Sequence, residues 1–245
     1  MEKSASGGFS GTALKIIAAA SMLIDHIGAV LIEGGNLTRG VNVALSGLIS
    51  FPSQPIWWKA DFILRLIGRI AFPIFAFLLV EGFLHTRDVR RYGARLLIFG
   101  FLSEIPFDLA VFHTPFYLDY QNVFFTLFFA LLALCGIRRW EDKGVLWKQV
   151  AAASLCCCFA SLLKTDYGAF GVGFVVLLYI TREDPRMQAA AGSLAIIWEL
   201  TAVLAFIPIG MYNKTRGKGK FKYSFYAFYP LHLLFLYGMW RLLFL

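Results

Sequence analysis

Long apolar segments are the feature of this chain that most constrains its fold. They recur in blocks of about 20 residues, the length at which an α-helix crosses the hydrocarbon core of a bilayer. The residues are 59% hydrophobic and 16% charged, with a mean hydropathy of +0.68, whereas a soluble domain carries roughly a quarter charged residues. The 245-residue sequence therefore predicts one all-α membrane domain over residues 1–245, a polytopic bundle of transmembrane helices.

About eight spans are predicted, covering residues 11–32, 62–84, 92–112, 122–137, 148–163, 168–180, 188–209 and 224–243. The first is interpreted as a retained span, because it is long, contains ionisable residues and lacks a clear cleavage site. A shorter apolar piece, residues 41–51, is predicted to re-enter the membrane or lie at its surface, and Trp57 and Trp58 suit such an interface. Pro73 is expected to kink the second span.

The formal net charge of +8 is explained by short basic loops and not by binding to nucleic acid. Residues 85–91, 138–147 and 181–187 are basic, and the positive-inside rule places them and the N-terminus in the cytoplasm, in a bacterial cytoplasmic membrane. The most basic loop, residues 211–223, then falls on the opposite side. Either the segment 188–209 is broken or re-entrant near Glu199, or an earlier span is miscounted.

Ionisable residues inside the spans mark the candidate functional site, because such groups are costly in hydrocarbon. Lys15 and His26 are eleven residues apart, so they share one helix face and lie roughly 16 Å apart along the axis. The polar residues form two predicted depth layers. The outer layer comprises His26, Arg65, Arg69, Glu104, Asp108, Asn122 and Asp166, and the inner layer comprises Lys15, Glu81, His85, Arg87, Arg90, Arg91 and Arg95.

Several pairings are expected within these layers. The buried carboxylates of Glu104 and Asp108 need cations, and Arg65, Arg69 and His26 are the expected partners at similar depth. The alternative for these groups is a purely structural ion pair. Tyr229 and His232 lie three residues apart on one face of the last span. Neither the four cysteines (Cys135, Cys156, Cys157 and Cys158) nor the histidines and carboxylates show a metal-ligand spacing, so no metal is expected.

Two layers joined by one helix face suit the movement of a group, a proton or an ion across the bilayer. This layout does not separate an acyltransferase from a proton-coupled transporter or flippase. A non-catalytic assembly factor is a third alternative, which is disfavoured because a scaffold does not need buried ionisable groups.

Six sequence motifs resemble the TraX family of membrane proteins, and together they extend over nearly the whole chain. They are LIDHIGAV, GRIAFPIFAFLLVEGFLHTRD, RLLIFGFLSEIPFD, NVFFTL, DYGAFGV and FYAFYPLHLL. The family is named for a protein implicated in N-terminal acetylation of conjugative pilin, and it is similar to membrane acyltransferases that use cytoplasmic acetyl-CoA. Those enzymes carry a basic residue, ten residues and then a histidine in the first helix, a spacing that Lys15 and His26 match. Residues 41–59 match no motif.

The resemblance implies an acetyltransferase with His26 at the catalytic centre, Lys15 beside the donor and acetyl-CoA as co-substrate. The expected acceptor is an N-terminal amine of a pilin-like protein, another exported peptide, a glycan or a lipid head group. The expected catalytic residues are His26, Asp25, Arg69, Glu104 and Asp108, with Arg69 at the oxyanion and Asp25 directed about 100° away from His26. The expected donor-binding residues are Lys15, Glu81, His85, Arg87, Arg90, Arg91 and Arg95, and the expected acceptor-binding residues are Arg65, Asn122, Asp166, Tyr229 and His232.

Overall fold

The protein is all-α in the part of the chain that the computed structural model describes, residues 7–35, 56–217 and 222–244. Two isolated β-bridges, Phe9–Tyr212 and Gln121–Thr165, are the exceptions among those residues. The helices are α1 (Gly11–Ile27), η1 (Gly28–Glu33), α3 (Ile56–Gly68), α4 (Ala71–His85), α5 (Val89–Phe112), α6 (Val123–Glu141), α7 (Leu146–Leu162), α8 (Gly168–Ile180), α9 (Pro185–Ala195), η3 (Ile197–Ala205), α10 (Phe206–Gly210) and α11 (Lys222–Phe244). The predicted fold class is confirmed.

Within the described part of the chain, four helical stretches are long and apolar enough to cross a membrane: Gly11–Glu33, Ile56–His85, Val123–Glu141 and Tyr223–Phe244. Shorter apolar stretches accompany them at Leu146–Leu162, Gly168–Ile180 and Ile197–Gly210. Helix α5 has 24 residues, and its outward side chains Ile98, Phe101 and Leu102 are 55–65% exposed, as expected for a lipid-facing surface. The chain is therefore a multi-pass membrane protein, but the predicted count of eight spans is not confirmed.

The predicted second span is two helices. Helices α3 and α4 are separated by a break at Arg69 and Ile70. Pro73 lies in the first turn of α4 and has no N–H to donate to the carbonyl of Arg69, so the helix is interrupted there. The kink attributed to Pro73 is confirmed. The helix pair begins six residues before the predicted start at Phe62, however, so Arg69 lies near its middle and not near its outer end.

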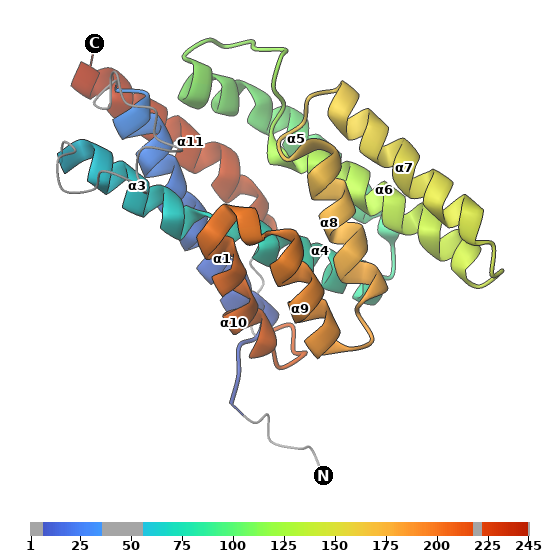
Figure 1. The fold of residues 1–245 in the computed structure, drawn as a ribbon. Helices are drawn as coiled ribbons and strands as arrows, with labels where there is room; N and C mark the ends of the chain where they lie inside the picture. Colours follow the sequence, from blue (N-terminus) through green and yellow to red (C-terminus); the bar gives the residue numbers. More distant parts are fainter. Residues whose placement is uncertain (1–6, 36–55, 218–221, 245) are drawn as a thin grey trace.

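The segment predicted as the seventh span is a helical hairpin, which Figure 1 shows as α9 rising into the bundle and α10 descending beside it. The chain turns at Glu199 (φ −89°, ψ 20°) and Leu200 (φ 47°, ψ −85°), whose backbone angles are not helical. The hairpin closes tightly at Gly192, where an added Cβ would lie 2.7 Å from Cε1 of Phe206. The expected break near Glu199 is therefore present, and it replaces a full crossing.

This hairpin removes the conflict with the positive-inside rule. The loop after α10 lies against the start of α1, because the amides of Gly11 and Thr12 donate to the carbonyls of Thr215 and Arg216 at 2.8 and 3.2 Å. The basic loops that follow α4, α6, α8 and α10 lie toward the same end of the bundle, with the loop after α6 set apart from the other three (Figure 1). The assignment of this end to the cytoplasm stays a prediction.

The interfacial tryptophans differ from each other. Both lie in the first turn of α3, where Trp57 is half exposed and Trp58 is fully buried beside Phe62. Only Trp57 therefore has the exposure expected at a membrane interface. The predicted re-entrant piece, residues 41–51, lies outside the described residues.

Candidate active site

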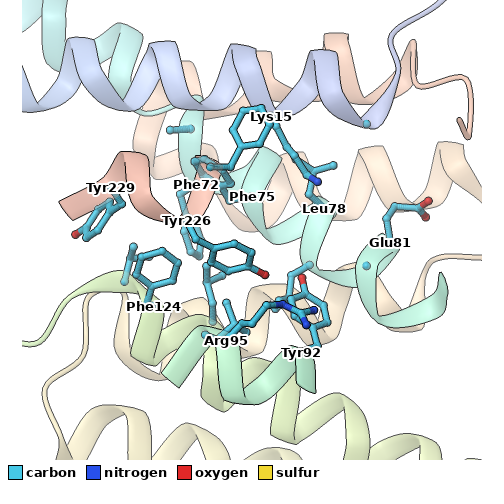
Figure 2. Close-up of a pocket in the computed structure, with 18 of the residues that line it drawn as sticks. Lys15, Phe72, Phe75, Leu78, Glu81, Tyr92, Arg95, Phe124, Tyr226 and Tyr229 are labelled. Carbon is cyan, nitrogen blue, oxygen red and sulfur yellow. The ribbon is translucent and has the colours of Figure 1, made fainter. Parts of the chain in front are cut away.

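A cavity of about 900 Å³ runs through the bundle between α1, α4, α5 and α11. This volume falls at the upper end of the range of about 300–1,000 Å³ typical of small-molecule sites. Figure 2 shows Glu81, Tyr92, Arg95 and Lys15 toward one end of the cavity and Tyr229 with Phe124 toward the other. Of the residues predicted from sequence, the lining includes Lys15, Asp25, His26, Arg69, Glu81, His85, Arg87, Arg91, Arg95, Asp166 and Tyr229.

The cavity is strongly basic at the end beside the loops that follow α4 and α10. Among the described residues, six cationic side chains line it there: Lys15, Arg87, Arg91, Arg95, Lys214 and Arg216. Two carboxylates share this end, of which Asp88 forms an ion pair with Arg91 at 3.0 Å and Glu81 lies 3.8 Å from Nδ1 of His85. The excess of positive charge favours an anionic ligand.

Arg90 was expected to bind the donor together with these residues, but the structure does not place it in this cluster. Its neighbour Arg91 lines the cavity, whereas Arg90 is exposed and is absent from the lining. Arg90 and Arg91 point about 100° apart on α5, and Arg90 is directed to the exposed side of the helix.

Two tyrosines that were not assigned to the site lie beside Arg95. The Arg95 guanidinium lies 5.5 Å from the ring centroid of Tyr92, and its side chain hydrogen-bonds to Tyr226. Tyr92 and Arg95 are three residues apart and therefore share a helix face. That spacing is the sequence signal for Tyr92, and the basic run in residues 211–223 was the signal for Lys214 and Arg216.

His26 lines the cavity and forms a direct hydrogen bond to a second histidine. Nδ1 of His26 lies 2.7 Å from Nε2 of His232, and Nδ1 of His232 lies 2.7 Å from the carbonyl oxygen of Phe228. The edge of Tyr229 packs against the His26 ring, with 5.9 Å between centroids. His232 is 6% exposed and does not line the cavity. The predicted contact of His232 with substrate stays a prediction, and the structure connects His232 to the cavity through its hydrogen bond to His26.

Asp25 does not contact His26. Its carboxylate accepts a hydrogen bond from the Arg65 guanidinium at 2.5 Å, and Nε of Arg65 lies 3.4 Å from Glu33. An added Cβ on Gly68 would lie 2.5 Å from Cγ of Asp25, so the small residue permits the close contact of α1 with α3. The expected divergence of Asp25 from His26 agrees with this geometry. Arg65 is occupied by these two carboxylates and is absent from the lining.

The expected pairing of Arg65, Arg69 and His26 with Glu104 and Asp108 is also wrong. Arg69 instead lies 3.4 Å from Glu199 at the tip of the α9–α10 hairpin. Glu104 accepts a hydrogen bond from Asn122, and Asp108 accepts one from the Tyr117 amide at 2.8 Å. Helix α5 packs against α6 and α11, whereas α3 packs against α1, so the two groups face different neighbours. Glu104, Asp108 and Asn122 do not line the cavity.

Asp166 lies in the turn between α7 and α8 and lines the cavity. Its Oδ1 accepts a hydrogen bond from the Tyr120 hydroxyl at 2.8 Å. Burial raises the pKa of the Asp166 carboxyl to about 6, partly offset by hydrogen bonds from Tyr120 and the Tyr167 amide. Among the described residues no lysine or arginine lies within ion-pair distance of it. Asp166 is therefore a partly buried acidic group that lines the cavity without an ion-pair partner among the described residues, and the charge of Arg69 in the same lining acts on it.

Comparison with known proteins places this architecture in a family. The family described as TraX protein matches residues 10–240. A relative from Dichelobacter nodosus, described as probable fimbrial assembly protein FimC, serogroup H1, is 29% identical over 254 aligned positions, which cover 92% of this chain and 93% of the relative. No solved structure gives a significant match. Because the match extends over nearly the whole chain, this protein belongs to the TraX family.

Proposed function

We propose that this protein is an integral membrane acetyltransferase that transfers the acetyl group of acetyl-CoA to an amine acceptor. One observation carries the proposal. A single cavity connects the six cationic side chains at the end of the bundle to His26 in its interior. A long donor with a phosphorylated end and a neutral reactive end matches that distribution of charge.

The cationic end suits the phosphates of acetyl-CoA. Arginine forms strong, charge-assisted hydrogen bonds with phosphate oxygens, and Arg87, Arg91 and Arg95 all face the cavity. Between this end and His26 the wall is largely aromatic and aliphatic, with Phe72, Phe75 and Leu78 toward the open space (Figure 2). That wall suits the pantetheine arm, and the spacing of roughly 16 Å between Lys15 and His26 along α1 requires a long ligand.

The acceptor is assigned to the part of the cavity beside Asp166. A carboxylate that faces the cavity without a lysine or arginine partner favours a cationic group, such as the ammonium of a peptide N-terminus. The relative from Dichelobacter nodosus is named as a fimbrial assembly protein, which favours a pilin-like peptide over a sugar or lipid head group.

The reaction requires the acceptor amine to lose a proton. His26 takes a proton from the ammonium as general base, and the free amine attacks the thioester carbonyl carbon. A carbon–nitrogen bond forms, the carbon–sulfur bond breaks, and the CoA thiolate leaves with a proton, so the net change is release of one proton, free CoA and the acetylated amine. Arg69, which lines the same cavity, is assigned to stabilise the developing oxyanion.

The test measures release of CoA thiol from acetyl-CoA by the full-length protein in nanodiscs, with a peptide bearing a free N-terminus as acceptor. Wild-type protein should release CoA only when an acceptor is present. His26→Ala should lower that rate by about 10²–10⁴-fold, the usual contribution of a general base, while acetyl-CoA binding measured by calorimetry persists. Absence of acetyl-CoA binding by folded wild-type protein would refute the proposal and favour a transporter.

A matched pair of variants separates donor binding from general loss of charge. Arg95→Ala should raise the KM for acetyl-CoA, because Arg95 faces the cavity. Arg90→Ala removes the same charge from an exposed position of the same helix outside the lining, and it should leave KM unchanged. Equal effects of the two substitutions would contradict the assignment of the cavity as the donor site.

A further inference from the structure

The hydrogen bonds around His26 determine which of its two ring nitrogens carries the proton. The carbonyl oxygen of Phe228 can only accept a hydrogen bond. Nδ1 of His232, which lies 2.7 Å from it, must therefore be protonated. This leaves Nε2 of His232 as the nitrogen that faces His26.

The charge state of the histidine pair follows from its surroundings. Among the described residues, neither His26 nor His232 forms an ion pair with a carboxylate, and His232 is nearly fully buried against Phe228 and Tyr229. An uncompensated imidazolium in such a site carries a large desolvation penalty. We therefore assign both rings as neutral in the resting protein.

With both rings neutral, one proton arrangement satisfies every hydrogen bond. Nε2 of His232 is unprotonated and accepts, and Nδ1 of His26, 2.7 Å away, is protonated and donates to it. The remaining nitrogen of His26, Nε2, then carries a lone pair. Only that nitrogen is available to take a proton, since Nδ1 is occupied by His232.

We propose that His232 is a positioning residue that holds His26 in the tautomer with a basic Nε2. The inference rests on the proposed function for its consequence in catalysis, but the tautomer itself is a property of the resting protein. When Nε2 of His26 takes the acceptor's proton, the hydrogen bond from Nδ1 to His232 becomes charge-assisted and shorter, which stabilises the imidazolium. His232 thus does what a carboxylate does in a serine hydrolase, without adding a charge to the bundle.

Contacts within α11 hold the His232 ring in the orientation in which it meets His26. His232 donates to the carbonyl four residues earlier in its own helix, which fixes the ring plane and directs Nε2 toward α1. Phe228 also stacks on the His232 ring, with 4.8 Å between centroids. These two contacts hold His232 in one orientation before any substrate binds.

The experiment combines a spectroscopic measurement with a kinetic one. The chain has four histidines, so ¹⁵N-histidine labelling gives a small set of ring signals, which are assigned by replacing His85 and His113 in turn. Wild-type protein without substrates should show His26 and His232 both protonated at Nδ1 and unprotonated at Nε2. A His26 signal protonated at Nε2 would overturn the inference whether or not the protein is an acetyltransferase.

Substitutions of His232 supply the kinetic test. His232→Leu should lower kcat at least tenfold, because a general base contributes about 10²–10⁴-fold and its tautomer is no longer fixed, with the KM for acetyl-CoA unchanged. Since Oε1 of glutamine occupies the position of histidine Nε2, His232→Gln should recover much of the lost kcat and keep the His26 tautomer. Equal loss in the leucine and glutamine variants, with the His26 signals unchanged, would show that His232 serves packing alone and would overturn the proposal.

Discussion

The contact between α1 and α3 at Gly68 gives a quantitative prediction about how the site is held together. Alanine at position 68 would place its Cβ 2.5 Å from Cγ of Asp25, with Cβ and Oδ1 of Asp25 also in its way. Carbon atoms pack at about 3.5–4.0 Å, so the overlap is about 1 Å. Asp25 cannot turn aside without losing its 2.5 Å ion pair with Arg65, so α1 and α3 must separate.

The expected cost follows from measured effects of overpacking. Inserting a methyl group into a packed interior usually costs about 1–3 kcal/mol. For a chain of this size each kcal/mol corresponds to about 2–4 °C, so Gly68→Ala should lower the apparent melting temperature by roughly 2–12 °C. The measurement is circular dichroism of the purified protein in detergent during heating.

Gly173 provides the matched control. It lies in α8, and a Cβ added there would meet no atom within 4 Å. Gly173→Ala should therefore raise stability by about 0.5–1 kcal/mol, since alanine is the better helix former. If Gly68→Ala melts at or above the temperature of Gly173→Ala, the close approach of α1 to α3 is wrong.

Further predictions concern Asp166 and Arg69, which both line the cavity. Burial raises the folded-state pKa of Asp166 to about 6 from an ordinary value of 3.8. The stability of the folded protein should therefore rise as the pH falls from 6 toward 4. Asp166→Asn should reduce this dependence of the melting temperature on pH. The same variant should raise the KM for an amine acceptor about tenfold or more while the KM for acetyl-CoA stays constant, and Asp119→Asn, which removes an exposed carboxylate paired with Lys164, should change neither. Arg69→Ala should destabilise the protein by about 1–3 kcal/mol, because it leaves Glu199 buried without its cation, and the 36% exposure of the Arg69 side chain limits the cost. Adding Glu199→Gln to Arg69→Ala should recover part of that loss in a double-mutant cycle, and strict additivity would contradict the pair.

The length of an apolar block predicted the helix bounds well where one block forms one uninterrupted helix. The bounds predicted for α6, α7 and α8 differ from the observed ones by a few residues, because an uninterrupted apolar run in lipid has no alternative to a helix. For residues 188–209 the sequence left a full crossing and a segment broken near Glu199 both open, and the structure shows the broken segment. Length and hydropathy are the same for a crossing helix and for a hairpin. The 3.4 Å contact of Glu199 with Arg69 joins two segments that are far apart in the chain.

For the candidate site, the predictions made within the first helix were correct and the pairings predicted between helices were wrong. Helical spacing within one element correctly placed Lys15 and His26 on the cavity, and it correctly separated Asp25 from His26. Pairings between elements were wrong for Glu104 and Asp108, since similar depth in the membrane does not specify which helices are neighbours. His232 was singled out by sequence, yet its contact is with His26 and not with the cavity, a distinction that depends on how α11 packs against α1.

The sequence by itself determined that the chain is a multi-pass helical membrane protein of the TraX family, with ionisable groups on the Lys15–His26 face of its first helix. Those properties follow from apolar length, from the cost of charge in hydrocarbon and from local motifs. Only the tertiary structure decided that the loops after α4 and α10 line one cavity, that Arg65 binds Asp25 and that His26 lies within hydrogen-bond distance of His232. These contacts join residues from helices far apart in the chain, and the packing of those helices depends on the shapes of all of them together.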